Sequence, residues 1–348
     1  MNSHHLGRRQ FLRTAGIALG AAAVGAAGAG TAWAQVSRGG LVTPAFESSP
    51  IGWASQGGGT TGGTGGTAVT ATSLSQLESY AGSSDKLIIT VSGLFTGSGE
   101  VTVKSNKTII GSGSGSGLVG IGLSMNGKSG ANISNVIIRN LNVSKVTASS
   151  GDGDAIHIQY ADHIWVDHCN LFSDTSHDED YYDGLLDITH ASDYITASWN
   201  TIHDHNKVSL VGHSDSNGSE DTGHLRVTYH HNWFHDTVQR NPRVRFGNPV
   251  HVYNNYYSNV SSYGVVSTDS GGVLVESNYF ENVSDSVIDQ TGSSSTGYTN
   301  AVNNYLVGSD TPVSNSPGSV KSIPYSYSVD TASTVKSVVS SGAGTGKI

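Results

Sequence analysis

The stretch LRVTYHHNWF at residues 225–234 is followed by VHVYNNYY at 250–257 and by VLVESNYF at 273–280. Each of the three begins with alternating apolar and polar residues, which is typical of a short strand. Each then has a polar turn that contains an asparagine, and a further pair of apolar residues follows the turn. The pattern predicts that the chain returns to the same local structure at regular intervals.

The unit recurs along most of the chain and predicts a stack of coils. The aligned asparagines are Asn142, Asn170, Asn200, Asn232, Asn255, Asn278 and Asn304, spaced by 28, 30, 32, 23, 23 and 26 residues. Repeats of this length indicate a solenoid, a propeller or an array. We favour a parallel β-helix because the strands are very short and no helix lies between them. A propeller would need about four strands per 40–50 residues. Stacked coils would align the asparagine amides into a ladder, in which donors and acceptors satisfy one another.

We therefore predict an all-β fold, a single-stranded right-handed parallel β-helix over about residues 85–310. A short N-terminal capping helix is expected near Ser73, because Ser73 and Gln76 have the spacing of a capping box. Leu74, Leu77 and Tyr80 would lie on one face of that helix.

The N-terminus resembles an export signal. Arg8 and Arg9 form a twin-arginine pair, an apolar stretch runs from residue 15 to 29, and Ala32 to Ala34 has the A-x-A form of a cleavage site. We expect residues 1–34 to be a twin-arginine signal peptide and residues 35–348 to be one secreted, extracellular catalytic domain. A membrane anchor is disfavoured, because spanning needs about 20 strongly apolar residues. The mature protein is expected to be a monomer without a membrane partner.

The composition limits the partners of the protein. The chain has 18 Lys and Arg against 27 Asp and Glu, a net charge of −9. Removal of residues 1–34 would take away three of the arginines and make the charge more negative. This charge argues against a nucleic-acid partner, which needs a basic field. Cys169 is the one cysteine, so no disulfide forms within the chain, and stability must come from packing and hydrogen bonding.

The charged residues that suggest chemistry follow the longer repeats. Extra residues in those repeats, at 143–169, 171–199 and 201–231, must leave the coils as loops, and such loops often form the binding face of a solenoid. These segments and the one after them hold Asp152, Asp154, Asp183, Asp187, Lys207, Arg240, Arg243 and Arg245. Since stacked coils lie roughly 5 Å apart, their carboxylates would converge, and clustered carboxylates need a cation. Hard oxygen ligands suit Ca²⁺, whereas a single Asp in such a turn would usually form an Asx-turn.

These residues resemble the pectate lyases of polysaccharide lyase family 1. The resemblance runs from about Gly52 to about Leu306. It includes Trp165-Val166-Asp167-His168, Asp183 to Ile188, Trp199-Asn200, Lys207 before Leu210-Val211-Gly212, and the R-x-P-x-x-R element from Arg240 to Arg245.

The resemblance implies a function and a set of roles. It implies that Asp154, Asp183 and Asp187 bind Ca²⁺, with Asp152 as a further possible ligand. It implies that Arg240 is the catalytic base and that Lys207 and Arg245 hold substrate carboxylates. The expected reaction is calcium-dependent β-elimination of polygalacturonate (pectate), which gives 4,5-unsaturated oligogalacturonates.

The chemistry fits these residue types. Elimination removes the proton on C5, next to a carboxylate, and that carboxylate must be neutralised as charge develops on it. A calcium ion and nearby cations would do so. The base is the difficulty, since arginine normally stays protonated.

Other functions fit less well. A polygalacturonase would use a pair of carboxylates as acid and base and would not need Lys207 and the two arginines. A pectin lyase, acting on methyl-esterified pectin, resembles this fold but lacks the calcium carboxylates. A non-catalytic polysaccharide-binding β-helix should lack the R-x-P-x-x-R element. Zinc is disfavoured for His203, His205, His230 and His231, because it needs closed tetrahedral geometry.

Overall fold

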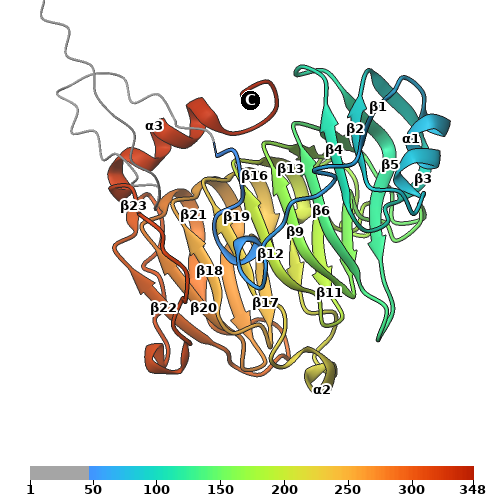
Figure 1. Cartoon of the computed structure of the whole chain (residues 1–348). Helices are drawn as coiled ribbons and strands as arrows, with labels where there is room; N and C mark the ends of the chain where they lie inside the picture. The colour runs from blue at the N-terminus through green and yellow to red at the C-terminus, as the bar shows by residue number, and fades with distance from the viewer. Residues whose placement is uncertain (1–46) are drawn as a thin grey trace, which may run out of the picture. The chain divides into compact units, whose positions relative to one another are not determined.

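A computed structural model of the protein describes residues 47–348. The predicted signal peptide, residues 1–34, lies outside the described residues, and the domain boundary at residue 35 stays a prediction. Within residues 47–348, consecutive coils stack side by side from β1 to β23 (Figure 1), and neighbouring strands pair in parallel. The predicted all-β, parallel β-helix is confirmed.

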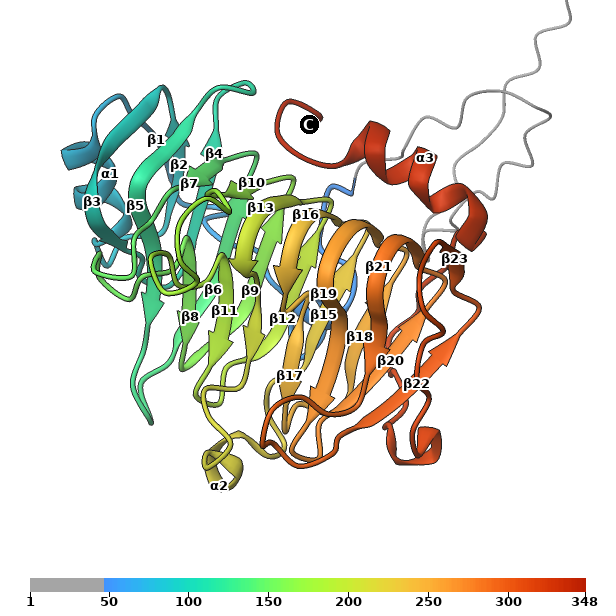
Figure 2. The ribbon, with the colours of Figure 1, turned by 180° about the vertical axis from the view of Figure 1, so that it is seen from behind.

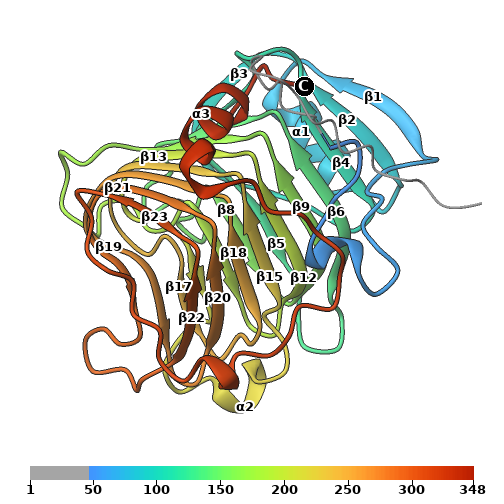
Figure 3. The ribbon, with the colours of Figure 1, turned by 90° about the vertical axis from the view of Figure 1, so that its left-hand side faces the viewer.

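Each coil contributes to two long sheets, which curve around a shared interior when viewed along the stack (Figure 3). Sheet A consists of β1 (Thr67–Ala71), β2 (Leu87–Val91), β4 (Lys107–Gly111), β6 (Ile133–Arg139), β9 (Ala161–Asp167), β12 (Asp193–Ser198), β15 (Val227–His230), β18 (Val250–Tyr253), β20 (Gly272–Glu276) and β22 (Tyr298–Val302). Their inward side chains, such as Ile109, Ile164 and Val227, have no exposed surface.

Sheet B contains two rows of strands, joined where β5, β19 and β21 run through both. The connecting strands are β5 (Gly117–Asn126), which also pairs with β3 (Leu94–Thr102), β19 (Tyr256–Thr268) and β21 (Tyr279–Ile288), and β21 pairs with β23 (Tyr305–Val307). The first row is β7 (Asn142–Ser144), β10 (Asn170–Phe172), β13 (Thr201–Lys207) and β16 (Trp233–Gln239). The second row is β8 (Ile156–Gln159), β11 (Leu186–Thr189), β14 (Leu210–Val211) and β17 (Arg243–Arg245).

Helices are few among the described residues: α1 (Leu74–Ala81), α2 (Gly218–Asp221), α3 (Ala332–Gly342), and the 3-10 turns η1 (Trp53–Ser55) and η2 (Pro317–Ser319). The predicted capping helix is α1, where the Ser73 hydroxyl accepts a hydrogen bond from the Gln76 backbone N–H at 3.3 Å. Its face holds buried Leu77. No helix in this part of the chain is both long enough and apolar enough to span a bilayer.

The asparagine ladder exists, but it is shorter than predicted. The Nδ2 amides of Asn200, Asn232, Asn255 and Asn278 each donate to the Oδ1 of the next member, ending at Asn304, over 2.9–3.0 Å. The assignment of Asn142 and Asn170 to this ladder is wrong. Asn170 pairs in register with Thr201, one residue beyond Asn200, so buried Cys169 takes the ladder position in its coil.

Two terminal segments cross the coils lengthwise. In the N-terminal segment, the backbone N–H groups of Trp53 and Ala54 donate to the hydroxyls of Thr228 and Thr196, each over 3.0 Å. We call residues 331–348 the C-terminal strap. In Figures 1 and 2 it leads from the last coils back over the sheet toward the first ones.

The strap is anchored at both ends. Val335 and Val339 of α3 pack against Tyr256 and Tyr279 of the late coils. Beyond α3, the Gly346 N–H donates to Asn140 Oδ1 over 2.6 Å, next to the early coils.

Candidate active site

Two buried carboxylates from adjacent coils meet at one glycine. Asp154 lies two residues before β8, and Asp187 lies within β11, opposite His157 of β8. A Cβ placed on Gly184 would lie 2.5 Å from Asp187 Oδ1 and 2.7 Å from Asp154 Oδ1. The Gly184 N–H also donates to Asp154 Oδ1 over 2.7 Å. Position 184 must therefore be glycine for both carboxylates to approach from opposite sides.

The environment of these carboxylates favours a cation. Asp154 and Asp187 are 5% and 6% exposed. Burial raises the pKa of the Asp187 carboxyl well above its usual range, and the nearby Asp154 charge raises it further. Burial also raises the pKa of Asp154, against the effect of its 2.7 Å hydrogen bond to His157 Nδ1. Two buried like charges repel each other, so a divalent cation with oxygen ligands would fit between them.

Asp183 lies closer to an amine than to that pair. Its side chain is 44% exposed, and its Oδ1 is 3.1 Å from Lys207 Nζ. The same amine donates to Asp180 Oδ1 over 2.9 Å. Burial alone would lower the pKa of Lys207, but the two carboxylates raise it above its usual value. Within residues 47–348, no three acidic, histidine or cysteine side chains are close enough together to hold a metal ion.

Asp152 lies on the other side of His157. Its Oδ2 accepts a hydrogen bond from the Ser124 hydroxyl over 2.8 Å and lies 3.8 Å from His157 Nε2. Burial lowers the pKa of His157, but Asp154 and Asp152 outweigh it and raise that pKa to about 9. Sequence reasoning missed His157. Its place three residues after Asp154 was visible, but this spacing has no meaning until β8 is known to turn the imidazole back onto that carboxylate.

The arginine element breaks sheet B as expected from its proline. β16 ends at Gln239 and β17 starts at Arg243, with the Asn241–Pro242 peptide between them. Arg240 has a φ of 62°, so the chain turns sharply at this residue. Buried Asn241 secures the turn, because its side chain donates to the Tyr263 carbonyl over 3.1 Å.

This turn brings Arg240 to the carboxylates. Its charge offsets part of the rise that burial causes in the pKa of Asp187. It also adds to the effect of Lys207, which lowers the pKa of Asp180. The Nε atoms of Arg240 and Arg243 are both buried, and neither has a hydrogen-bond partner among the described residues. A buried donor without a partner is costly. A ligand that reached either atom would relieve this cost.

Strand register places Arg243 in line with the acidic pair. Asp187 is followed by Leu210 and then Arg243 across β11, β14 and β17. Adjacent strands are about 4.8 Å apart. Burial and the neighbouring Arg245 charge lower the pKa of Arg243. Arg245, two residues further along β17, instead donates from Nε to Asp215 Oδ1 over 2.6 Å.

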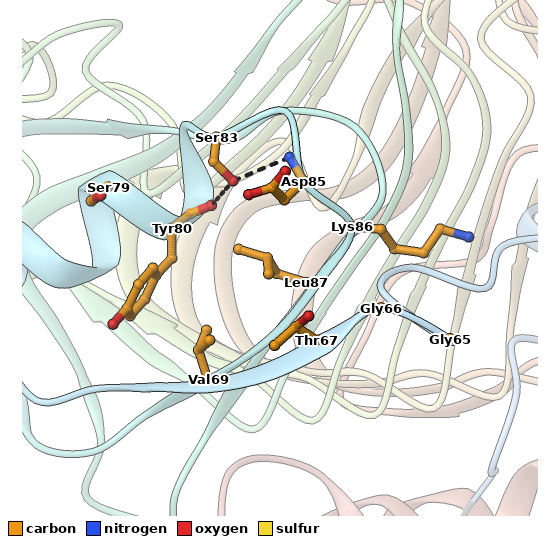
Figure 4. Close-up of a pocket in the computed structure, with 10 residues that line it drawn as sticks. All are labelled: Gly65, Gly66, Thr67, Val69, Ser79, Tyr80, Ser83, Asp85, Lys86 and Leu87. Carbon is orange, nitrogen blue, oxygen red and sulfur yellow. Dashed lines mark hydrogen bonds between the residues drawn. The ribbon is translucent and has the colours of Figure 1, made fainter.

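A pocket of about 710 Å³, open to solvent, lies away from these residues. It is lined by residues of β1, α1, β2 and the loops beside them at the first coil (Figure 4). There the Ser83 hydroxyl bonds the Tyr80 carbonyl, and Lys86 extends away from the other residues. None of the site residues described above lines it. Those residues lie in the second row of sheet B, at the end of β13 and in the adjoining loops.

Comparisons with known proteins agree with this arrangement. Residues 34–348 match the family described as pectate lyase. The chain is 48% identical to a probable pectate lyase A of Neosartorya fischeri over 295 residues, which is 84% of this chain and 87% of that protein. It is 45% identical to pectate lyase A of Aspergillus niger over the same shares of the two chains.

A solved structure extends the likeness to three dimensions. A pectate lyase from a Bacillus species, crystallised in complex with trigalacturonate, superposes with a TM-score of 0.77 at 33% identity and covers 85% of this chain and 99% of its own. The coiled sheets carry buried carboxylates and arginine donors without partners among the described residues, and the relatives are 33–48% identical over most of the chain. The chain therefore belongs to the pectate lyase family and is a polysaccharide lyase.

Proposed function

We propose that this pectate lyase cleaves α-1,4-linked polygalacturonate by calcium-dependent β-elimination at the second row of sheet B. The observation that carries the proposal is the meeting of Asp154 and Asp187 at Gly184, next to the unpartnered Nε of Arg240. The complex of the Bacillus relative with trigalacturonate supports the substrate class.

Asp154 and Asp187 would hold the calcium ion. Asp183 would join them by leaving Lys207, since its side chain is half exposed and free to turn. Asp152 would reach the site only through His157 or a water molecule, because its carboxylate faces the far ring nitrogen. When bound, calcium supplies positive charge that neutralises a galacturonate carboxylate and stabilises the charge that develops beside C5.

The remaining steps belong to the side chains. Arg240 takes the proton from C5, and the electron pair of that bond forms the C4–C5 double bond as the C4 glycosidic oxygen leaves. Lys207 and Arg245 hold the carboxylates of the bound chain and so fix its register.

The test is the absorbance of the unsaturated product formed from polygalacturonate, with and without a chelator. We expect product with calcium, none in excess chelator, and recovery when calcium is restored. Full activity in the chelator would exclude the calcium role. A preference for fully methyl-esterified pectin would favour the pectin lyase alternative.

The cellular part of the proposal concerns the N-terminus. We propose that residues 1–34 direct twin-arginine export and that a secreted monomer begins at Gln35. Mass spectrometry of the culture medium should find that N-terminus. Replacement of Arg8 and Arg9 by lysine should retain the full-length chain in the cell, and unchanged secretion would contradict this route.

A further inference from the structure

Arg245 is held through two of its three nitrogens. Its Nε donates to Asp215 Oδ1 over 2.6 Å, and its Nη1 donates to the Gly212 carbonyl over 3.2 Å. Nη2 donates to none of residues 47–348. The close approach needs glycine at 212, where φ is +91° and a Cβ would lie 2.9 Å from the Arg245 Cβ. The guanidinium is therefore held in one orientation, in which Nη2 is the nitrogen without a partner among the described residues.

Asp215 is itself fixed by a second loop. It follows β14, and its Oδ2 accepts a hydrogen bond from the Ser294 hydroxyl over 2.7 Å. Ser294, in the loop between β21 and β22, accepts one from Arg243 Nη2 over 2.6 Å. Partial burial alone would raise the pKa of Asp215, but Ser294 and Arg245 together lower it below its usual value. Both carboxylate oxygens of Asp215 thus accept hydrogen bonds from other side chains.

A second carboxylate, that of Asp269, lies near Arg245 and could accept from Nε in place of Asp215. Asp269 Oδ2 lies 3.8 Å from Arg245 Nε, is buried and has no hydrogen-bond partner among the described residues. If Asp215 were absent, Asp269 would be the nearest acceptor for Nε. Asp269 Oδ1 accepts a hydrogen bond from the Ser295 N–H over 3.1 Å, so only Oδ2 lacks a partner. Since a buried carboxylate oxygen without a partner is costly, the guanidinium would turn toward Asp269 and away from its present orientation.

We propose that Asp215 is a positioning residue, which sets the orientation of Arg245 toward the uronate carboxylates of the substrate. Ser294 locks Asp215 in place and couples it to Arg243. The inference rests on the substrate-binding role given to Arg245 above. An exposed arginine loses much of its side-chain freedom on binding, so an arginine fixed beforehand binds a carboxylate more tightly.

The test is a double-mutant cycle on polygalacturonate at saturating calcium, with kcat and KM measured separately. Asp215→Ala should raise KM about tenfold, the usual scale for one hydrogen bond to a charged group, and leave kcat within about twofold. Asp215→Asn keeps an acceptor for Nε and should restore most of the affinity. Ser294→Ala should cause a smaller rise in KM. In an Arg245→Ala background, Asp215→Ala should have no further effect on KM.

Asp310→Ala is the matched control, because Asp310 is exposed and its carboxylate makes no hydrogen bond or ion pair with any described residue. It should leave both constants unchanged, and melting temperatures should report any loss of fold. An equal rise in KM on Asp215→Ala with and without Arg245 would overturn the positioning role alone. An Arg245→Ala variant with wild-type KM would instead overturn the substrate role of Arg245, and this inference with it.

Discussion

Two rows of polar side chains run across the same coils, and they are built on opposite principles. In the asparagine ladder, Asn200, Asn232 and Asn255 are fully buried, and each amide donates to the next. Along the second row of sheet B, Asp154 and Asp187 face each other, and Arg240 keeps a buried donor without a partner. The ladder satisfies its own hydrogen bonds within the protein, whereas the second row leaves like charges close together and a buried donor without a partner among the described residues.

The difference separates stability from function. A satisfied polar network specifies how one coil sits on the next, and losing a member leaves buried groups unpaired. Converging like charges destabilise the free protein, but they give a cation and an anionic substrate strong partners. Substitutions in the two rows should therefore affect different measurements.

The largest effect is expected at Asp187. Asp187→Asn should abolish calcium-dependent turnover, because one of the two converging carboxylates is lost. The same change removes a buried repulsion, so the calcium-free variant should melt at a higher temperature than the calcium-free wild type. Activity assays and thermal melts with and without calcium test both points.

The wild type should gain melting temperature when calcium is added, and the variant should gain none. A variant that remains active, or that is still stabilised by calcium, would show that the ion binds elsewhere.

A smaller loss of activity is expected when either of two arginines is replaced, and the two replacements should affect different kinetic constants. Arg240→Lys keeps the charge but loses the planar fork and its reach, so kcat should fall by about a hundredfold or more with KM little changed. Arg245→Lys should mainly raise KM, because a carboxylate clamp acts in the ground and transition states alike.

Arg226→Lys serves as the control, because Arg226 directly precedes β15 of sheet A and pairs with Asp193 instead of a residue of the site. It should keep both constants. If Arg240→Lys retains more than about a tenth of wild-type kcat, Arg240 is not the base, and Lys207 or Arg243 should be tested next.

In the ladder, Asn255→Ala should lower stability instead of turnover. It removes the acceptor for both the side chain and the backbone N–H of Asn232, which are fully buried. We expect a loss of about 2–4 kcal/mol in the free energy of unfolding, with kcat unchanged at a temperature where the variant is folded. Denaturant titration measures the loss.

Asn126→Ala, at an exposed asparagine of β5, should cost far less. Equal losses at the two positions would mean that the ladder contributes nothing beyond an ordinary surface contact.

The smallest effect, counted per pH unit, concerns Glu47, an acid of the N-terminal segment whose side chain is 14% exposed. Burial raises the pKa of the Glu47 carboxyl to about 8, and the adjacent Asp167 charge adds to the shift. The folded state therefore keeps a proton that the unfolded state releases near its ordinary pKa. Stability should then fall as pH rises between about 4.5 and 8, by up to roughly 1 kcal/mol per pH unit.

Glu47→Gln should flatten this part of the stability curve, and Glu78→Gln, at an exposed position of α1, should leave it unchanged. Urea titrations across this pH range give the slopes. Identical slopes for the wild type and Glu47→Gln would show that Glu47 is ionised in the folded protein.

The sequence alone revealed the coils, because each repeat carries its own alternation and turn. It placed the ladder one residue too far along at Asn142 and Asn170. In those coils an asparagine follows the true ladder position, and only strand register distinguishes the two neighbours. The repeat pattern therefore predicts how long each coil is better than it predicts which residue of the coil occupies the ladder position.

At the site, sequence reasoning chose Asp154, Asp187 and Arg240, which the structure brings together. It could not find His157, Asp180 or Asp215. Asp180 and Asp215 stand in loops and meet residues of other coils about thirty positions away. Such contacts depend on the path of each loop, and no local pattern encodes that path.

The C-terminal strap has a consequence for how the chain acquires its structure during synthesis. A solenoid can in principle fold from its N-terminus as it emerges, since each repeat needs only its neighbour. Here Thr345 and Gly346 return to Ser114 and Asn140, more than 200 positions earlier. The early coils therefore receive these contacts only after residue 346 has left the ribosome, so the oldest part of the fold stays incomplete while more than 200 later residues are made.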